Sequence, residues 1–251
     1  MTAAPAFTRP TPPRFDDPLE ERAHSKRVLV AAFRLFSRFG FDEGIMGHLS
    51  FRDPVEPTHF WQNPFAVNFA HITTRDLLRI SFSGEVIEGT GHVHPSGFGL
   101  HSKLYEGQAR VKAIAHSHSM YGKVWSTLDR LLDPISTESA QFHHRHVLYD
   151  SFAEGEAERV GLTLADHRAI IMKNHGILTV GATVDEAAYS FIALERACQA
   201  QILAESTTTG PRALPAEHAD EVSARYSPAS AWLNFQPLFD DIALRHPDAL
   251  T

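Results

Sequence analysis

Cysteine, long apolar runs and positive charge are scarce in this sequence of 251 residues. The single cysteine, Cys198, excludes an internal disulfide and a thiolate zinc site. No run of 18 apolar residues predicts a membrane span, and an N-terminus with prolines at 5, 10, 12 and 13 is unlike a signal peptide. With 23 basic against 30 acidic residues, the net charge of −7 disfavours nucleic-acid binding. We therefore expect a cytoplasmic protein that binds neither nucleic acid nor membrane.

Histidine, by contrast, is abundant. The chain has 16 histidines against 5 tyrosines and 4 methionines. Imidazole serves both as a metal ligand and as an acid or base near neutral pH. The remaining composition, 43% hydrophobic and 21% charged, is typical of a soluble globular protein. This excess of histidine is a first indication of a metal site.

Apolar periodicity divides the chain into three parts. Residues 1–17 are predicted to be a flexible, proline-rich segment, 18–206 one domain, and 207–251 a tail packing on that domain or on a neighbouring subunit. Three- and four-residue spacing predicts helices, and alternation or short apolar runs predict strands. The expected helices are 28–39, 97–106 and 183–205, and the expected strands are 47–53, 77–82, 86–88, 111–118 and 168–173.

Two histidines at the end of an apolar strand form the main chemical motif. Because successive side chains of a strand alternate faces, His116 and His118 point the same way with Cα atoms roughly 6.5 Å apart. His175 follows the second apolar strand, and Gly176 beside it permits a sharp turn. Three histidines would leave a metal coordination position open, as in catalytic zinc sites, and would also suit iron, manganese or cobalt. A chance pair on an exposed strand is the alternative for the first two.

Four motifs, taken in order, resemble the class II aldolase/adducin family. They are Gly47-His48-Leu49-Ser50-Phe51-Arg52, Pro95-Ser96-Gly97, His116-Ser117-His118 and Asn174-His175-Gly176. The resemblance implies an α/β fold, a three-layer α/β/α sandwich with a central, mostly antiparallel sheet. It also implies a homotetramer, and one divalent metal ion per subunit, most readily Zn²⁺, held by His116, His118 and His175.

The sequence departs from that family at the residues that do its chemistry. The family's glutamate, which acts as general acid and base, corresponds to Gly97, and an asparagine that binds the substrate corresponds to His48. The phosphate-binding serine pair is reduced to Ser96. A glycine cannot move protons, so a sugar-phosphate aldolase or epimerase is disfavoured.

Other residues are candidates to replace the lost groups. For the catalytic role we consider His146, His48 and Glu138, with His92, His94, His143 and His144 as further imidazoles; solvated loop histidines are the alternative interpretation. For substrate binding we consider Arg52 and Arg145 as partners of a carboxylate, Ser96, and Trp61 as an aromatic wall. Arginines are more often surface ion-pair partners and aromatics more often core.

A metal that stabilises an enolate serves both aldol cleavage and decarboxylation. Decarboxylation needs no base for a hydroxyl proton, so the loss of the glutamate favours it. We therefore predict a divalent-metal-dependent lyase that cleaves a carbon–carbon bond in a small hydroxy- or oxo-carboxylic, possibly aromatic, substrate. One alternative is a non-haem Fe(II) oxygenase acting on an aryl-pyruvate-like substrate. A second is a non-catalytic, adducin-like interaction module.

Overall fold

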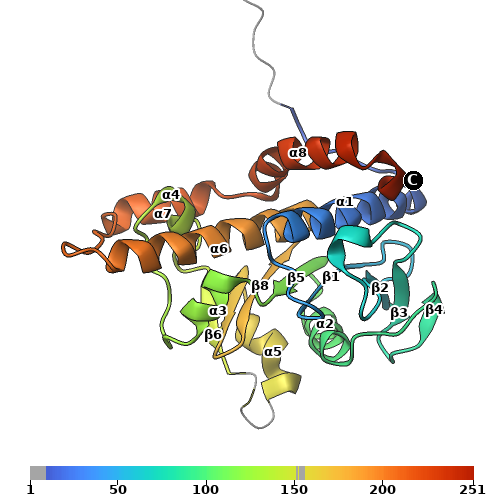
Figure 1. The fold of residues 1–251 in the computed structure, drawn as a ribbon, viewed down its shortest axis with the longest axis horizontal. Coiled ribbons are helices and arrows are strands. Elements are labelled where there is room, and N and C mark those ends of the chain that lie inside the picture. The colour runs from blue at the N-terminus through green and yellow to red at the C-terminus, as the bar shows by residue number, and fades with distance from the viewer. Residues whose placement is uncertain (1–9, 151, 153–155) are drawn as a thin grey trace, which may run out of the picture.

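The computed structural model describes residues 10–150, 152 and 156–251, with the side chains of 156–158 excepted. Its centre is one eight-stranded sheet with the order β4-β3-β2-β1-β5-β8-β7-β6 (Figure 1). Every neighbouring pair is antiparallel except β6 and β7. The strands are β1 (Gly47–Arg52), β2 (His59–Gln62), β3 (Leu78–Ser81), β4 (Val86–Glu88), β5 (Ala113–Ser117), β6 (His146–Tyr149), β7 (Ala169–Met172) and β8 (Gly176–Gly181).

Helices cover both faces of this sheet, which confirms the predicted three-layer sandwich (Figure 1). One layer contains α1 (Pro18–Arg38), α3 (Met120–Ser126), α6 (Val184–Glu205) and α8 (Pro228–Arg245). The other contains α2 (Pro95–Gly107) and α5 (Glu156–Leu164), which pack on each other. The remaining elements are α4 (Thr137–Ala140), α7 (Ala216–Arg225), η1 (Phe69–His71) and η2 (Pro247–Leu250). In the part of the chain so described, no helix is both long and apolar enough to span a membrane.

Strand alternation sends side chains into two separate cores. In β1, Leu49 and Phe51 join the core beneath α1 and α6. In β5, Ile114 joins the second core, beneath α2 and α5. Because alternate side chains share a face, His48 and Ser50 of β1 lie on the α2 side. His116 lies on that side too, two residues after Ile114. The polar residues of the candidate site are therefore on the α2 face.

The C-terminal segment is more regular than its sequence indicates. Residues 207–251 contain the helices α7 and α8, which weak apolar patterning did not predict. Ser227 and Ser230 form a capping box at the start of α8, and Pro237 lies inside this helix. Helix α8 packs on α1 and α6 and buries Phe235 completely. A contact with a neighbouring subunit stays a prediction.

The N-terminal prediction falls largely outside what the structure describes. Residues 1–9 lie outside the described residues. Phe15, in the described remainder, lies with its ring 5.0 Å from that of His24, measured between centroids. This contact places the end of the proline-rich segment against α1.

Candidate metal centre

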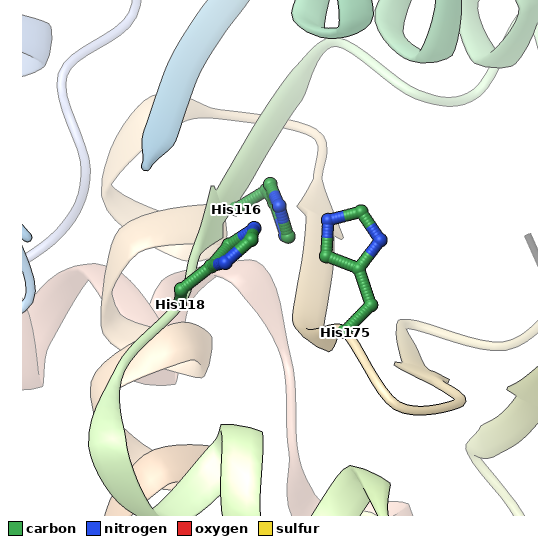
Figure 2. A group of neighbouring side chains, drawn as sticks. All are labelled: His116, His118 and His175. Carbon is green, nitrogen blue, oxygen red and sulfur yellow. The ribbon is translucent and has the colours of Figure 1, made fainter. Parts of the chain in front are cut away.

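The structure brings His116, His118 and His175 together at one end of the sheet (Figure 2). His116 belongs to β5, His118 follows its end, and His175 lies in the turn between β7 and β8. One ring nitrogen of each lies within 4.8 Å of the others. The antiparallel pairing of β5 with β8 produces this arrangement, because it sets the β7–β8 turn beside the end of β5.

Glycine is needed where this turn approaches β5. Gly176 has a φ of +158°, and a Cβ there would lie 3.0 Å from the carbonyl oxygen of Ser117. A larger residue would push His175 away from the other two imidazoles. The His-Gly pair in the sequence is thus a steric requirement of the site.

The three imidazoles have the protonation that metal ligands require. The Nδ1 of His116 donates to the carbonyl of Ile177 at 2.8 Å, which leaves the Nε2 lone pair for a ligand. Burial, followed by the neighbouring imidazoles, holds the pKa of His116 well below its ordinary value. Burial and then His175 lower the pKa of His118 to about 4, and burial lowers that of His175. Three neutral, convergent imidazoles fit a divalent transition-metal ion.

A buried carboxylate supports the backbone that leaves this site. Ser119, the N-cap residue of helix α3, follows His118 directly and makes no side-chain capping bond. Glu195 of α6 accepts instead from the Tyr121 and Gly122 amides at 2.8 and 2.6 Å. The Ser119 hydroxyl donates to it at 2.6 Å. Glu195 therefore anchors the start of α3 and, with it, the position of His118.

We expect Glu195→Ala to lower the free energy of unfolding by about 2–4 kcal/mol, because three buried donors lose their acceptor. Chemical denaturation measures the change. The control is Glu221→Ala on α7, an exposed residue paired with Arg225, for which a loss of about 0.5 kcal/mol or less is expected. Equal losses in the two variants would show that Glu195 is not an anchor.

A cavity of about 410 Å³ opens over the three histidines. Its wall is mostly apolar, and Phe152, 75% exposed, stands with its ring centroid 6.3 Å from that of His175. No carboxylate is found among the described residues that line it. The lining comprises Met46, Gly47, His48, His94, Ser96, Gly99, Leu100, His116, His118, Tyr149, Phe152, Met172 and His175.

Three of the predicted polar residues lie in this cavity. His48 is the strand partner of His116, and their ring centroids are 4.9 Å apart. His94 is the N-cap of α2 and accepts from the Gly97 amide at 3.3 Å. The hydroxyl of Ser96 lies 3.0 Å from the same ring nitrogen of His94. His48 and Ser96 are therefore available to a bound molecule, whereas both ring nitrogens of His94 are engaged, since its Nε2 donates to the carbonyl of Ile45 at 3.1 Å.

Gly97 is surrounded closely, in a way the sequence did not indicate. A Cβ at this position would lie 2.7 Å from Cδ2 of His48 and 2.8 Å from Nε2 of Gln62. His48 thus fills the space into which a side chain at residue 97 would project. His48 and Gly97 both depart from the family pattern, and the two departures are linked because these residues pack directly against each other.

The other predicted catalytic residues are elsewhere, which corrects that expectation. His146 begins β6 and spends both ring nitrogens on the backbone, accepting from Leu132 and donating to Phe142, each at 2.8 Å. Glu138 is exposed on α4. Both sit away from the residues that line the cavity.

The remaining imidazole candidates are also outside the cavity. His92 is exposed. His143 and His144 face Asp220 of α7, with nitrogen–oxygen distances of 3.7 and 4.0 Å. None of the three is among the described residues that line the cavity.

Three predicted substrate-binding residues are likewise structural. Arg52, at the far end of β1, donates to the carbonyls of Tyr105 and Pro57. Arg145 pairs with Asp166 at 2.8 Å on the surface. Trp61 is 1% exposed in the core beneath α1. Arg145 is thus a surface ion-pair partner and Trp61 a core residue, which are the commoner roles of arginine and of aromatic residues.

The position of His146 predicts an acid-labile contribution to stability. Burial is the main cause that lowers the pKa of His146 from 6.5 to about 4. The unfolded chain takes up a proton below pH 6.5, whereas the folded chain does so only near pH 4. The contribution of His146 to the free energy of unfolding is therefore fully present above pH 6.5. It is lost as the pH falls from 6.5 to 4, and the loss reaches about 3 kcal/mol at pH 4.

His146→Gln tests this assignment, because the amide keeps a donor and an acceptor but does not titrate. We expect a shallower loss of unfolding free energy between pH 6.5 and 4, measured by urea denaturation, and unchanged enzymatic turnover. A collapse of turnover with unaltered acid stability would return His146 to the catalytic candidates.

Sequence reasoning missed a buried chain of polar side chains behind His48. Nδ1 of His48 lies 2.8 Å from Nε2 of His101, whose Nδ1 lies 2.6 Å from the Ser50 hydroxyl oxygen. Ser50 lies 2.7 Å from the hydroxyl of Tyr105. A pattern pointed to it: His48 and Ser50 are two apart on a strand, and His101 and Tyr105 are four apart on a helix.

Comparison with known proteins places this geometry in context. The family model described as Class II Aldolase and Adducin N-terminal domain matches residues 27–202. The decarboxylase NovR of Streptomyces niveus is 35% identical, over 96% of this chain and 92% of its own. A Streptomyces roseochromogenus subsp. oscitans protein, 4-hydroxy-3-prenylphenylpyruvate oxygenase/4-hydroxy-3-prenylbenzoate synthase, is 34% identical over 94% and 88%. A solved structure, L-fuculose 1-phosphate aldolase from Glaciozyma antarctica PI12, superposes with a TM-score of 0.88 at 35% identity, covering 95% and 96%.

Proposed function

Because this chain belongs to the class II aldolase/adducin family, we propose that it is a metal-dependent lyase that decarboxylates, or cleaves by retro-aldol reaction, a small oxo- or hydroxy-carboxylic substrate. The observation that carries the proposal is the three-histidine cluster at the base of a cavity whose described lining has no carboxylate. Without a carboxylate base, the loss of CO₂ from a bound acid is favoured over removal of a hydroxyl proton.

His116, His118 and His175 are the proposed ligands of one divalent ion per subunit, zinc being the first choice. When bound, such an ion supplies a Lewis acid for the negative charge that develops on an enolate oxygen. His48 and Ser96 offer polar contacts to substrate oxygens. The apolar wall, with Tyr149 and Phe152, suits an aromatic substituent.

One relative supports a second function. The Streptomyces roseochromogenus subsp. oscitans protein is named an oxygenase of a phenylpyruvate and matches most of this chain. Three neutral imidazoles also suit Fe(II). An oxygenase acting on an aryl-pyruvate-like acid is therefore the alternative, and only the metal and the need for dioxygen separate it from the lyase.

The test is metal analysis of protein purified without added metal, followed by assays on hydroxy and oxo acids with and without oxygen. The lyase proposal expects product and released CO₂ or aldehyde under anaerobic conditions, loss on chelation and recovery with one equivalent of a divalent ion. Turnover that consumes oxygen in step with substrate supports the oxygenase instead. A complete absence of turnover with bound metal contradicts both enzymatic proposals.

We also propose that the enzyme is a homotetramer, as the family resemblance implies. Light scattering of the purified protein should give about four times the mass of one chain, 27.9 kDa. A monomeric mass would contradict it.

A further inference from the structure

Four polar side chains link the candidate site to the interior of the α2 layer. His48, His101, Ser50 and Tyr105 are 3%, 0%, 0% and 1% exposed. Consecutive members are joined by the contacts of 2.8, 2.6 and 2.7 Å given above. In such a chain each group has a limited number of protons, so the direction of one hydrogen bond determines the next.

The direction of these hydrogen bonds is set by Tyr105, at the end of the chain of side chains that is farthest from the cavity. Within the described part of the chain, the hydroxyl of Tyr105 has one hydrogen-bond partner, the oxygen of Ser50. A buried hydroxyl proton without an acceptor costs about 1–3 kcal/mol, so Tyr105 donates to Ser50. Ser50 then uses its own proton to donate to Nδ1 of His101.

The two histidines follow from that choice. Burial lowers the pKa of His101 to about 3, so its ring is neutral and carries one proton. Because Nδ1 accepts, that proton is on Nε2 and is donated to Nδ1 of His48. Because Nδ1 of His48 accepts this hydrogen bond, it carries no proton of its own, so the proton of the His48 ring is on Nε2. This nitrogen is the one left to the cavity.

We propose that Tyr105, Ser50 and His101 are positioning residues that lock His48 as an Nε2–H donor, pointing a hydrogen bond at an oxygen of the bound substrate. In this tautomer, Nε2 has no lone pair for a metal ion or for a substrate proton. His48 is therefore neither a fourth ligand nor a base, although its ring centroid is only 4.9 Å from that of His116. The oxygen-bearing, acidic character of the ligand rests on the proposed function, whereas the tautomer does not.

The lock gives the site a fixed dipole where charge develops. A donor held in place before the reaction needs no reorganisation, and removing one such donor from an enzyme typically costs about 10²–10³-fold in kcat. An imidazole free to exchange tautomers would present a lone pair to an anionic oxygen for part of the time. The buried chain prevents that unproductive state.

Neutron diffraction from crystals of the deuterated protein, with and without zinc, tests the lock directly. We expect deuterium on Nε2 of both His48 and His101, on the Ser50 oxygen directed at His101, and on the Tyr105 oxygen directed at Ser50. Deuterium on Nδ1 of His48 would overturn the proposal, whatever reaction the enzyme performs. This result is independent of turnover, so it also separates failure of the lock from failure of the proposed function.

Variants of Ser50, His101 and Tyr105 provide the functional test. Ser50→Ala is expected to lower kcat by about 10–100-fold with little change in KM, because it releases the tautomers of His101 and His48 without touching substrate. His101→Gln retains a donor and an acceptor and should keep kcat within about tenfold of the parent, whereas His101→Leu should match Ser50→Ala. Tyr105→Phe removes only one hydroxyl group, so it tests the same chain of hydrogen bonds with a smaller change if the other variants misfold. Unchanged kcat in Ser50→Ala and His101→Leu, with both folded, would overturn the functional part of the proposal.

Discussion

His118→Ala should abolish stoichiometric metal binding and enzymatic turnover while the protein stays folded. Changes to residues that only orient metal ligands typically cost about 10–100-fold in affinity, so removing a ligand should cost more than about 100-fold. His118 is the best choice of the three histidines, because it follows the end of β5 and is half-buried, whereas His116 is buried within that strand. Elemental analysis after dialysis, with circular dichroism as the folding check, measures the outcome.

A matched histidine variant controls for nonspecific binding. His218→Ala changes an exposed imidazole on α7 and should leave metal content and turnover as in the parent. Full metal occupancy in His118→Ala would show that the three-histidine cluster is not the binding site. Loss of metal in both variants would point to adventitious binding at surface histidines.

Gly97→Glu should not restore an acid–base glutamate but should inactivate the enzyme. The new Cβ would meet the His48 ring at 2.7 Å and the Gln62 amide at 2.8 Å. Overpacking of this kind costs about 1–3 kcal/mol, and displacing His48 removes a donor worth about 10²–10³-fold in kcat. We expect turnover to fall at least about 100-fold, and Gly97→Ala to share most of that loss, since the clash begins at Cβ.

Gly99→Ala is the control for the helix itself. Two residues along α2, a Cβ at Gly99 would meet nothing within 4 Å. Replacing a helical glycine there should raise the free energy of unfolding by about 0.4–1 kcal/mol. Thermal denaturation of Gly97→Glu, Gly97→Ala and Gly99→Ala separates the cost of the clash at residue 97 from the effect of helix propensity. A gain of turnover in Gly97→Glu would show that residue 97 retains room for a catalytic carboxylate.

Local pattern together with the family resemblance was sufficient for the layers and for the convergence of His116, His118 and His175, whereas their role as metal ligands stays a prediction. The apolar runs ending at His118 and near His175 indicated two strands, and the family motifs implied that they meet. Alternation also explains the placement of Trp61, which the sequence left open between core and cavity. The strands and the meeting of the motifs could be predicted because strand periodicity and motif order are local properties.

The positions of the polar side chains around the three histidines depend on tertiary packing instead. His146 and Arg145 follow one another in a histidine-rich segment near the motifs, yet the parallel pairing of β6 with β7 takes them away from the cavity. His101 and Tyr105 belong to a segment, 97–106, for which the sequence predicted only a helix, and the crossing of α2 over β1 sets them against Ser50 and His48. Such contacts join residues far apart in the chain, which one sequence without relatives cannot reveal.

The close approach of Gly97 to His48 also limits which residues can occupy the two positions together. An imidazole at residue 48 and a side chain at residue 97 compete for one volume, so the two positions cannot be exchanged independently. A side chain at residue 97 present together with an imidazole at residue 48 would overpack the contact between α2 and β1, at a cost of about 1–3 kcal/mol. A side chain restored at residue 97 therefore calls for a smaller residue at position 48 in the same variant.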